Sequence, residues 1–198
     1  MKLHFGGMVL ALLLALALSG CGSMLAQNPR GKLKPVNAVA EGADGSVMLK
    51  GADVVAYFQQ GKYVQGNPRL TSTYEEVTFR FASPEHKAMF DRDPTRYLPQ
   101  YGGYCANGIA YGIPWGGDAD TWKIIGGRLF IFGGQASKDA FGLDEKRNLE
   151  LADKYWKDEV AGSNSFLRRI WRLVVKVPHY QTGEELARAV ADSRARAQ

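Results

Sequence analysis

The N-terminus constrains the rest of the chain most strongly, because it determines which residues remain to fold. Lys2 gives a positive start, and residues 8–18 are all Ala, Leu, Val or Met. A basic start followed by an apolar segment and small residues is typical of a secretory signal peptide. The apolar segment is shorter than the ~20 residues that a transmembrane helix needs. We therefore predict that residues 1–20 are a signal peptide and not part of the fold.

The residues at the predicted cleavage site, Leu18-Ser19-Gly20-Cys21, resemble the lipobox of bacterial lipoproteins. The resemblance implies that the Cys21 thiol carries a lipid, with acyl chains such as palmitate, and becomes the first residue of the mature protein. It also implies a cell-envelope protein that is held by this lipid in the membrane and faces the periplasm. Gly22 stands where an Asp would favour retention in the inner membrane, so the outer membrane is favoured. The alternatives are an ordinary signal peptide or an N-terminal membrane helix.

Lipidation of Cys21 would leave Cys105 as the only thiol of the mature chain. An intramolecular disulfide is then impossible, although export would permit one. A zinc site of the Cys-x-x-Cys type is excluded for the same reason. Removing 20 of the 198 residues leaves 178, which is enough for one domain with a substantial core and extensions.

The basic charge of the chain is concentrated in its C-terminal part. Residues 21–162 carry 17 Lys and Arg against 17 Asp and Glu, whereas residues 163–198 carry seven against three. A neutral domain with a basic tail does not have the electrostatic character of a nucleic-acid-binding protein. We therefore expect no nucleic-acid partner.

Local sequence patterns predict an α+β fold with a C-terminal helical extension. A Gly-, Ala-, Asn- and Pro-containing stalk precedes the domain. Predicted regions are a flexible stalk over 21–45, a domain over 46–160 and a basic amphipathic helical tail over 163–198.

Within the domain, alternation of apolar residues predicts one strand over 73–82, and two apolar runs joined by Gly126-Gly127 predict a β-hairpin. Ser83-Pro84-Glu85 and Asp93-Pro94 are typical helix starts. Helical spacing predicts a helix over 139–160 and a turn or two of helix near residues 53–58, with Gly61 able to end it. The glycine-rich segment 101–108 is expected to be an irregular loop.

Four segments carry a resemblance to a known family. They are Asp53-Val-Val-Ala-Tyr-Phe, Phe79-Arg-Phe-Ala-Ser-Pro-Glu-His, Pro99-Gln-Tyr-Gly-Gly-Tyr-Cys-Ala and Ala152-Asp-Lys-Tyr-Trp. Their order and spacing over residues 53–156 resemble the YHS domain family, in the form found in exported bacterial proteins. The resemblance implies a small α+β domain in which a strand and a hairpin pack against short helices. It also implies metal handling, with copper or zinc as the expected ion, although metal-binding members have several cysteines and this chain has one.

Cys105 and His86 are the candidate metal ligands. Cys105 lies in the glycine-rich segment, where it is a soft metal ligand, a redox-sensitive thiol, or a small buried residue that supports the loop. His86 lies in the first turn of a predicted helix, where it is a metal or substrate ligand, a general acid–base, or a surface residue beside the helix dipole. Asp118 and Asp120 are either ligands for a hard cation or turn residues. No Ser/His/Asp order, phosphate loop or paired carboxylates appear, so no catalytic residue is predicted.

The tail segment 166–177 has apolar and basic residues at helical spacing. Phe166, Ile170, Trp171 and Val174 share one face, and the arginines lie largely elsewhere. Such a helix can lie in an anionic membrane surface, contact a protein, or pack on the domain with its arginines in solvent. Thr182 to Glu185 is a capping-box pattern that opens a final helix.

The sequence thus predicts a lipid-anchored extracytoplasmic domain that binds a metal ion or another small ligand. One alternative is a thiol-dependent enzyme or redox sensor that uses Cys105. Another is an envelope scaffold that acts through its basic tail.

Overall fold

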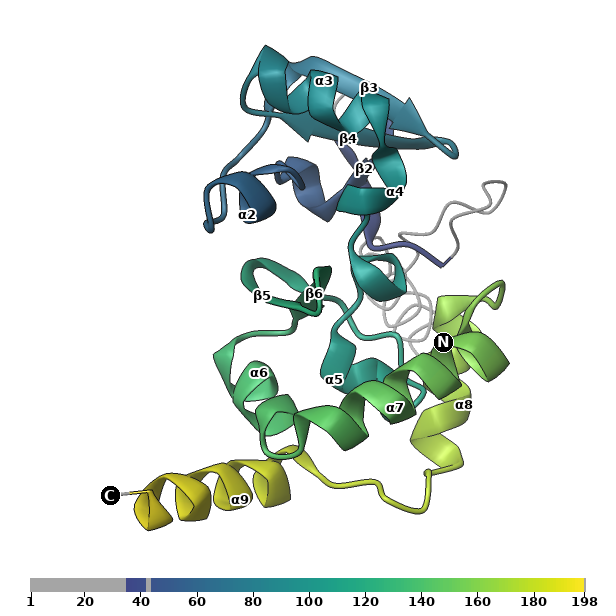
Figure 1. Cartoon of the computed structure of the whole chain (residues 1–198). Helices are drawn as coiled ribbons and strands as arrows, with labels where there is room; N and C mark the ends of the chain where they lie inside the picture. Colours follow the sequence, from purple (N-terminus) through teal and green to yellow (C-terminus); the bar gives the residue numbers. More distant parts are fainter. Residues whose placement is uncertain (1–34, 42–43, 198) are drawn as a thin grey trace, which may run out of the picture.

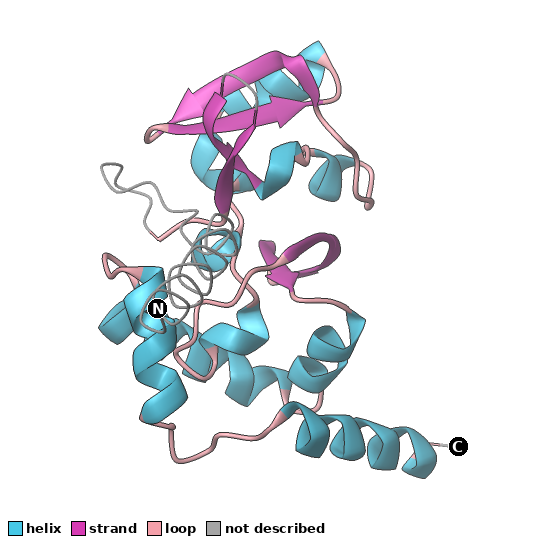
Figure 2. Cartoon of the chain, turned by 180° about the vertical axis from the view of Figure 1, so that it is seen from behind, coloured by secondary structure: helices cyan, strands magenta, loops and turns pink. Residues whose placement is uncertain are grey.

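The computed structural model describes residues 35–41 and 44–197 and confirms the predicted α+β fold (Figure 1). One half of the molecule is a β-sheet covered by short helices, the other half is helical, and a β-hairpin lies between them (Figures 1 and 2). The predicted signal peptide and the lipidation site at Cys21 lie outside the described residues. In the part of the chain that is described, no helix combines the length and the hydropathy needed to cross a bilayer.

The larger sheet has four strands in the order β1-β2-β4-β3. Their bounds are β1 Ala38–Glu41, β2 Asp44–Met48, β3 Asn67–Tyr74 and β4 Val77–Phe81. β2 runs parallel to β4, and the other neighbouring pairs are antiparallel. The flexible stalk predicted over 21–45 is therefore wrong at its C-terminal end, because β1 already begins at residue 38.

The single strand predicted over 73–82 is also wrong, because the chain reverses within it. Glu75 and Glu76 both have positive φ, 49° and 65°, and Tyr74 pairs with Val77 across the turn. Two central residues with positive φ characterise the tight turn that best joins twisted antiparallel strands. Glutamate is not the residue type that normally marks such a turn, so the sequence pattern concealed it.

Short helices cover the sheet. They are η1 Leu49–Gly51, α2 Ala56–Gln59, α3 Pro84–Arg92 and α4 Pro94–Tyr97. Both predicted helix starts are confirmed: the Ser83 hydroxyl accepts a hydrogen bond from the backbone N–H of His86 at 3.2 Å, and the Asp93 carboxylate accepts one from that of Arg96 at 3.4 Å. Gly61 follows α2 with φ of 63°, as expected of a residue that ends a helix.

The glycine-rich segment contains two helical turns and not the predicted irregular loop. They are η2 Gln100–Gly103 and α5 Ala106–Ile109. Tyr101, Gly102 and Gly103 lie within η2 and have φ of 55°, 61° and 78°, so this turn is left-handed and not a regular helical turn. The sequence signalled the unusual backbone but not the helix that follows it.

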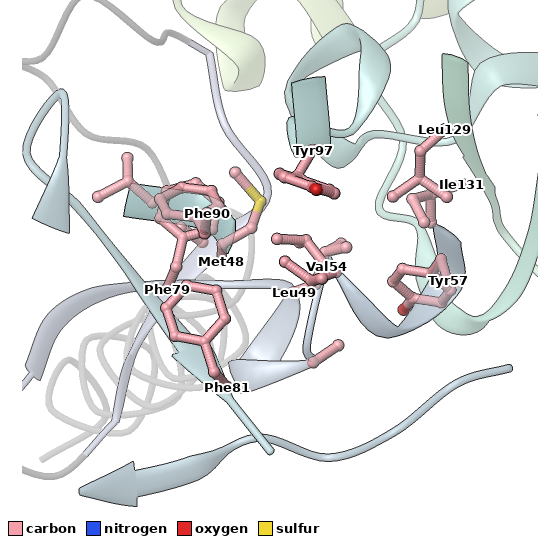
Figure 3. Packing of buried hydrophobic residues seen from close by; sticks show 14 of the residues in the cluster. Met48, Leu49, Val54, Tyr57, Phe79, Phe81, Phe90, Tyr97, Leu129 and Ile131 are labelled. Atoms are coloured by element: carbon pink, nitrogen blue, oxygen red, sulfur yellow. The ribbon is translucent and has the colours of Figure 1, made fainter. Parts of the chain in front are cut away.

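The predicted hairpin is confirmed as β5 Asp118–Ile125 and β6 Arg128–Phe132, and it divides the core in two. Successive side chains of a strand point to opposite faces. Leu129 and Ile131 accordingly pack in the cluster under the sheet, with Tyr57 and Tyr97 nearby in Figure 3, whereas Phe130 and Phe132 pack among the helices. All buried residues of the three described clusters lie between positions 36 and 177, so a protein without residues 1–21 keeps this core.

The helical half contains α5 and the segments that follow the hairpin: α6 Gln135–Gly142, α7 Glu145–Tyr155, η3 Trp156–Val160, α8 Ser165–Val174 and α9 Gly183–Arg196. The single helix predicted over 139–160 is wrong, because the chain breaks between α6 and α7. The Asp144 carboxylate caps the new helix by accepting from the backbone N–H of Arg147 at 3.2 Å. The capping box of Thr182 and Glu185 is confirmed at the start of α9.

The helix predicted within 166–177 is confirmed as α8. The alternative in which it packs on the domain with its arginines in solvent is wrong. The side chains of Arg169 and Arg172 are buried, with residue exposures of 6% and 7%.

Candidate functional site

Cys105 lies inside the molecule, at the start of α5. Its residue exposure is 3%, and its Sγ accepts a hydrogen bond from the backbone N–H of Gly108 at 3.4 Å. The Ser137 hydroxyl of α6 lies 3.0 Å from the same sulfur. The backbone of Cys105 is held on the opposite side by a bridge to Ile131 of β6. The thiol is thus a fixed, buried group that joins α5 to α6. This position agrees with the alternative of a small buried residue that supports the loop.

Ser137 connects this thiol to a cavity of ≈ 430 Å³ between α6 and α9. The residues that line the cavity come from α5, the β6–α6 connection, α6 and α9 and are mostly small or apolar: Asn107, Gly133, Ala136, Ser137, Asp139, Ala140, Gly183, Leu186, Ala187, Val190 and Arg194. The volume lies within the ~300–1,000 Å³ typical of small-molecule sites. We call this space the α6/α9 pocket.

Asn107 is the polar residue that most distinguishes the α6/α9 pocket. Its residue exposure is 8%, and its side-chain amide forms no hydrogen bond with any residue that the structure describes. A carboxamide has two N–H donors and an oxygen acceptor. Solvent in the pocket reaches these atoms of Asn107, because they are not among the fully buried side-chain atoms that lack a partner. A ligand in the pocket could replace water as the hydrogen-bond partner of Asn107, which would orient the ligand.

The rim of the pocket carries an ion pair between its two helices. Arg194 of α9 donates to the Asp139 carboxylate of α6 at 2.5 Å, with side-chain exposures of 66% and 23%. An exposed pair of this kind contributes little to stability. None of the residues of α9 is buried, so this helix is the less firmly held wall of the pocket.

A second cavity of ≈ 400 Å³ shares Ala140 and Leu186 with the α6/α9 pocket but is less suited to a ligand. Its polar side chains Asn148 and His179 already hydrogen-bond, at 2.9 Å and 2.8 Å, to the backbone oxygens of Phe141 and Ala110. These two hydrogen bonds hold α7 and the tail to the domain. The α6/α9 pocket has the more apolar lining, and its Asn107 amide has no partner among the described residues.

His86 is held in the sheet half by a buried carboxylate that the sequence did not reveal. Its Nδ1 lies 2.7 Å from Asp53 Oδ2, and Gln60 Nε2 lies 3.4 Å from its Nε2. With an exposure of 7%, His86 is not the surface residue that one reading of the sequence expected. Asp53, which is fully buried, also accepts hydrogen bonds from the backbone N–H groups of Val55, Ala56 and Ala82. This arrangement joins α2, β4 and α3.

Asp118 and Asp120 lie at the start of β5 beside another cavity, of ≈ 300 Å³. Below this strand the Tyr57 hydroxyl donates to the Ala119 carbonyl at 2.6 Å. Burial, followed by the charges of Tyr63 and Asp120, raises the pKa of Tyr57, so its hydroxyl stays a donor at neutral pH. The two aspartates therefore flank a structural hydrogen bond.

The structure does not gather the candidate metal ligands. Within residues 35–41 and 44–197, no three His, Cys, Asp or Glu side chains converge on one point where a metal ion could bind. Cys105 has Ser137 as its neighbour, and His86 has Asp53. The copper or zinc site at Cys105 and His86 stays a prediction, and the two residues would serve separate sites.

Comparison of the chain with models of known protein families, with curated proteins and with solved structures gave no match.

Proposed function

We propose that the chain is a lipid-anchored protein of the extracytoplasmic side that binds a small, mainly apolar molecule in the α6/α9 pocket. The observation that carries the proposal is the Asn107 amide, which lines the pocket and has no hydrogen-bond partner among the described residues. Ligand sites are typically apolar spaces with a few polar groups that orient the ligand. The Asn107 amide and the Ser137 hydroxyl would be those groups.

The lipid anchor rests on the sequence, where residues 1–20 and Cys21 resemble a lipoprotein signal. The likeness of residues 53–156 to the YHS family supports a binding role without naming the ligand. The pocket supports an organic molecule over a bare metal ion, because its lining offers apolar contact and few anionic ligands. Asp139 is the only carboxylate among its lining residues, and Arg194 already pairs with it.

The alternative of thiol chemistry is supported by one contact, the 3.0 Å between Cys105 Sγ and Ser137 Oγ. A ligand that hydrogen-bonds to Ser137 would lie one residue away from the sulfur. The rate of Cys105 alkylation, given below, separates this alternative from simple binding.

The test is binding of the neutral fluorescent probe N-phenyl-1-naphthylamine to protein lacking residues 1–21. Ala187→Trp places a large side chain in the pocket, and Ala191→Trp on the same helix is the control, because Ala191 is exposed and does not line the pocket. We expect Ala187→Trp to weaken binding at least about tenfold, since most apolar contact is lost, and Ala191→Trp to leave it unchanged. Equal affinity in the two variants would refute the site.

A further inference from the structure

The tail helix α8 is inverted with respect to an ordinary amphipathic helix, which buries its apolar face. Four apolar side chains at positions i, i+3, i+4 and i+7 face solvent: Leu167, Ile170, Trp171 and Val174, with exposures of 62%, 46%, 55% and 78%. Leu173 and Val175 extend the patch, at 52% and 38%. We call these six residues the α8 apolar face. Contiguous exposed apolar surface of this kind marks an interaction site.

The opposite side of α8 fixes this orientation through its arginines. Arg169 Nε donates to the Pro114 carbonyl at 2.7 Å, and Arg172 pairs with Glu159. Arg168 pairs with the same carboxylate at 3.1 Å. Rotation of the helix to bury its apolar face would remove these arginines from their partners and leave Glu159 unpaired, which is costly. The outward apolar face is therefore part of the folded state.

The chemistry of this surface suits a membrane. The segment from residue 160 to residue 183 contains no Asp or Glu, and Lys176 is exposed just after the helix. Tryptophan beside aliphatic residues and a lysine is the composition of helices that lie at the boundary between headgroups and acyl chains, and the cation favours anionic lipids. In Figures 1 and 2, α8 lies at the edge of the helical half.

The described chain begins close to α8. The Tyr104 hydroxyl donates to the Val36 carbonyl at 3.0 Å, and Arg169 of α8 lies over the Tyr104 ring at 5.9 Å from its centroid. Residues 22–34 separate Cys21 from the first described residue, and 13 residues span at most about 45 Å. A lipid on Cys21 would thus hold the membrane within reach of the side of the molecule that carries the α8 apolar face.

We propose that the α8 apolar face inserts into the headgroup region of the membrane that holds the lipid on Cys21. The choice of a membrane, and not a protein, as the partner of this face rests on the lipid anchor of the proposed function. Insertion gives the protein a second attachment and fixes its orientation, with α8 toward the bilayer. A lipid alone would not fix which side of the domain faces the bilayer.

The first test uses the mature lipidated protein in vesicles of phosphatidylethanolamine and phosphatidylglycerol with brominated acyl chains, which quench tryptophan at the membrane. The comparison uses Trp115→Phe protein, because Trp115 is 40% exposed and follows Pro114, which contacts α8. We expect quenching in this protein and its loss when Trp171→Phe is added, since Trp122 and Trp156 are only partly exposed and lie outside α8. Equal quenching in both proteins, or none in either, would overturn the proposal.

The second test uses protein lacking residues 1–21 and measures its partition onto phosphatidylglycerol vesicles. Val174→Glu should lower the partition coefficient about tenfold or more, since a charge replaces the most exposed apolar side chain. Met89→Glu, which changes an apolar residue of 36% exposure on α3, should leave it unchanged. A dimer that Val174→Glu dissociates, without vesicle binding, would show a protein interface and refute the membrane.

The two proposals fail separately. Mass spectrometry of the mature protein reports the lipid on Cys21, and quenching of Trp171 reports the α8 apolar face. If the protein is lipidated but Trp171 is not quenched, only the insertion of the α8 apolar face is refuted. If the protein is not lipidated but its vesicle partition depends on Val174, only the lipid anchor is refuted.

Discussion

Asp53 provides the sharpest test of how the sheet half is held together. Its carboxylate has no exposed surface and accepts four hydrogen bonds, at 2.9 Å from Val55 N, 3.2 Å from Ala56 N, 2.7 Å from Ala82 N and 2.7 Å from His86 Nδ1. The first two cap the turn that leads into α2, and the other two hold the end of β4 and the start of α3. We predict that Asp53→Ala strongly destabilises the fold.

The magnitude follows from the groups that lose their partners. Loss of a helix N-cap costs about 1 kcal/mol, and each buried donor left unpaired costs about 1–3 kcal/mol. With one cap and the donors of Ala82 and His86, the expected loss is about 4 kcal/mol in the free energy of unfolding. Asp53→Asn should cost about 2 kcal/mol. In Asp53→Asn the amide oxygen still accepts from the backbone N–H groups before α2. The new N–H₂ group faces the N–H of Ala82, which therefore loses its acceptor. His86 can change tautomer and accept a hydrogen bond from the N–H₂ group.

The assay is urea unfolding followed by circular dichroism, with Asp91→Ala as the control. Asp91 also accepts two hydrogen bonds, from Ser72 and Lys87, but its side chain is 44% exposed. The control should lose less than about 1 kcal/mol because water replaces those partners. Equal losses in Asp53→Ala and Asp91→Ala would refute the reasoning.

Three further predictions concern separate parts of the fold. Cys105 should react with iodoacetamide at least about tenfold more slowly in the folded protein than in urea, since its thiol is buried; equal rates would favour a reactive thiol. Gly102→Ala should lower the free energy of unfolding by about 2–4 kcal/mol, because φ is 61° and the new Cβ would overlap a backbone carbonyl oxygen. Gly61→Ala is the control, because Gly61 has φ of 63° but open space around the new Cβ, and it should cost about 1 kcal/mol in the same assay. Similar losses of stability in the two variants would contradict the overlap at Gly102. Arg128 holds the pKa of the Asp153 carboxyl below its usual 3.8, so this contribution is present above about pH 4 and lost as pH falls through the lowered pKa. Arg128→Gln should therefore reduce the stability difference between pH 5 and pH 2, and an unchanged difference would contradict the pairing.

Features set by neighbouring residues were predictable from the sequence. The helix start at Ser83 and the Gly126-Gly127 turn each depend on a few adjacent residues, and both are confirmed. The turn at Glu75 and Glu76 was missed because its positive φ values are imposed by strand pairing and not by glycine.

Features set by distant residues were not predictable in this way. The contact between Asp53 and His86 joins residues 33 positions apart, and only the folded sheet brings them together. The spacing in α8 defined two faces, but the one that packs inward depends on Glu159 and the Pro114 carbonyl. Asn107 gave no signal at all, because its importance comes from the lack of a partner in the fold.

The central claim is that the α6/α9 pocket binds a small, mainly apolar molecule oriented by Asn107. The most direct measurement is the NMR signal of the Asn107 side-chain amide, assigned with an Asn107→Leu variant, during titration with N-phenyl-1-naphthylamine. The account predicts a saturable shift of this signal and of α9 backbone signals, with little change in the β3–β4 region. An Asn107 side-chain signal that stays in place while the probe binds elsewhere, or no binding at all, would contradict the account.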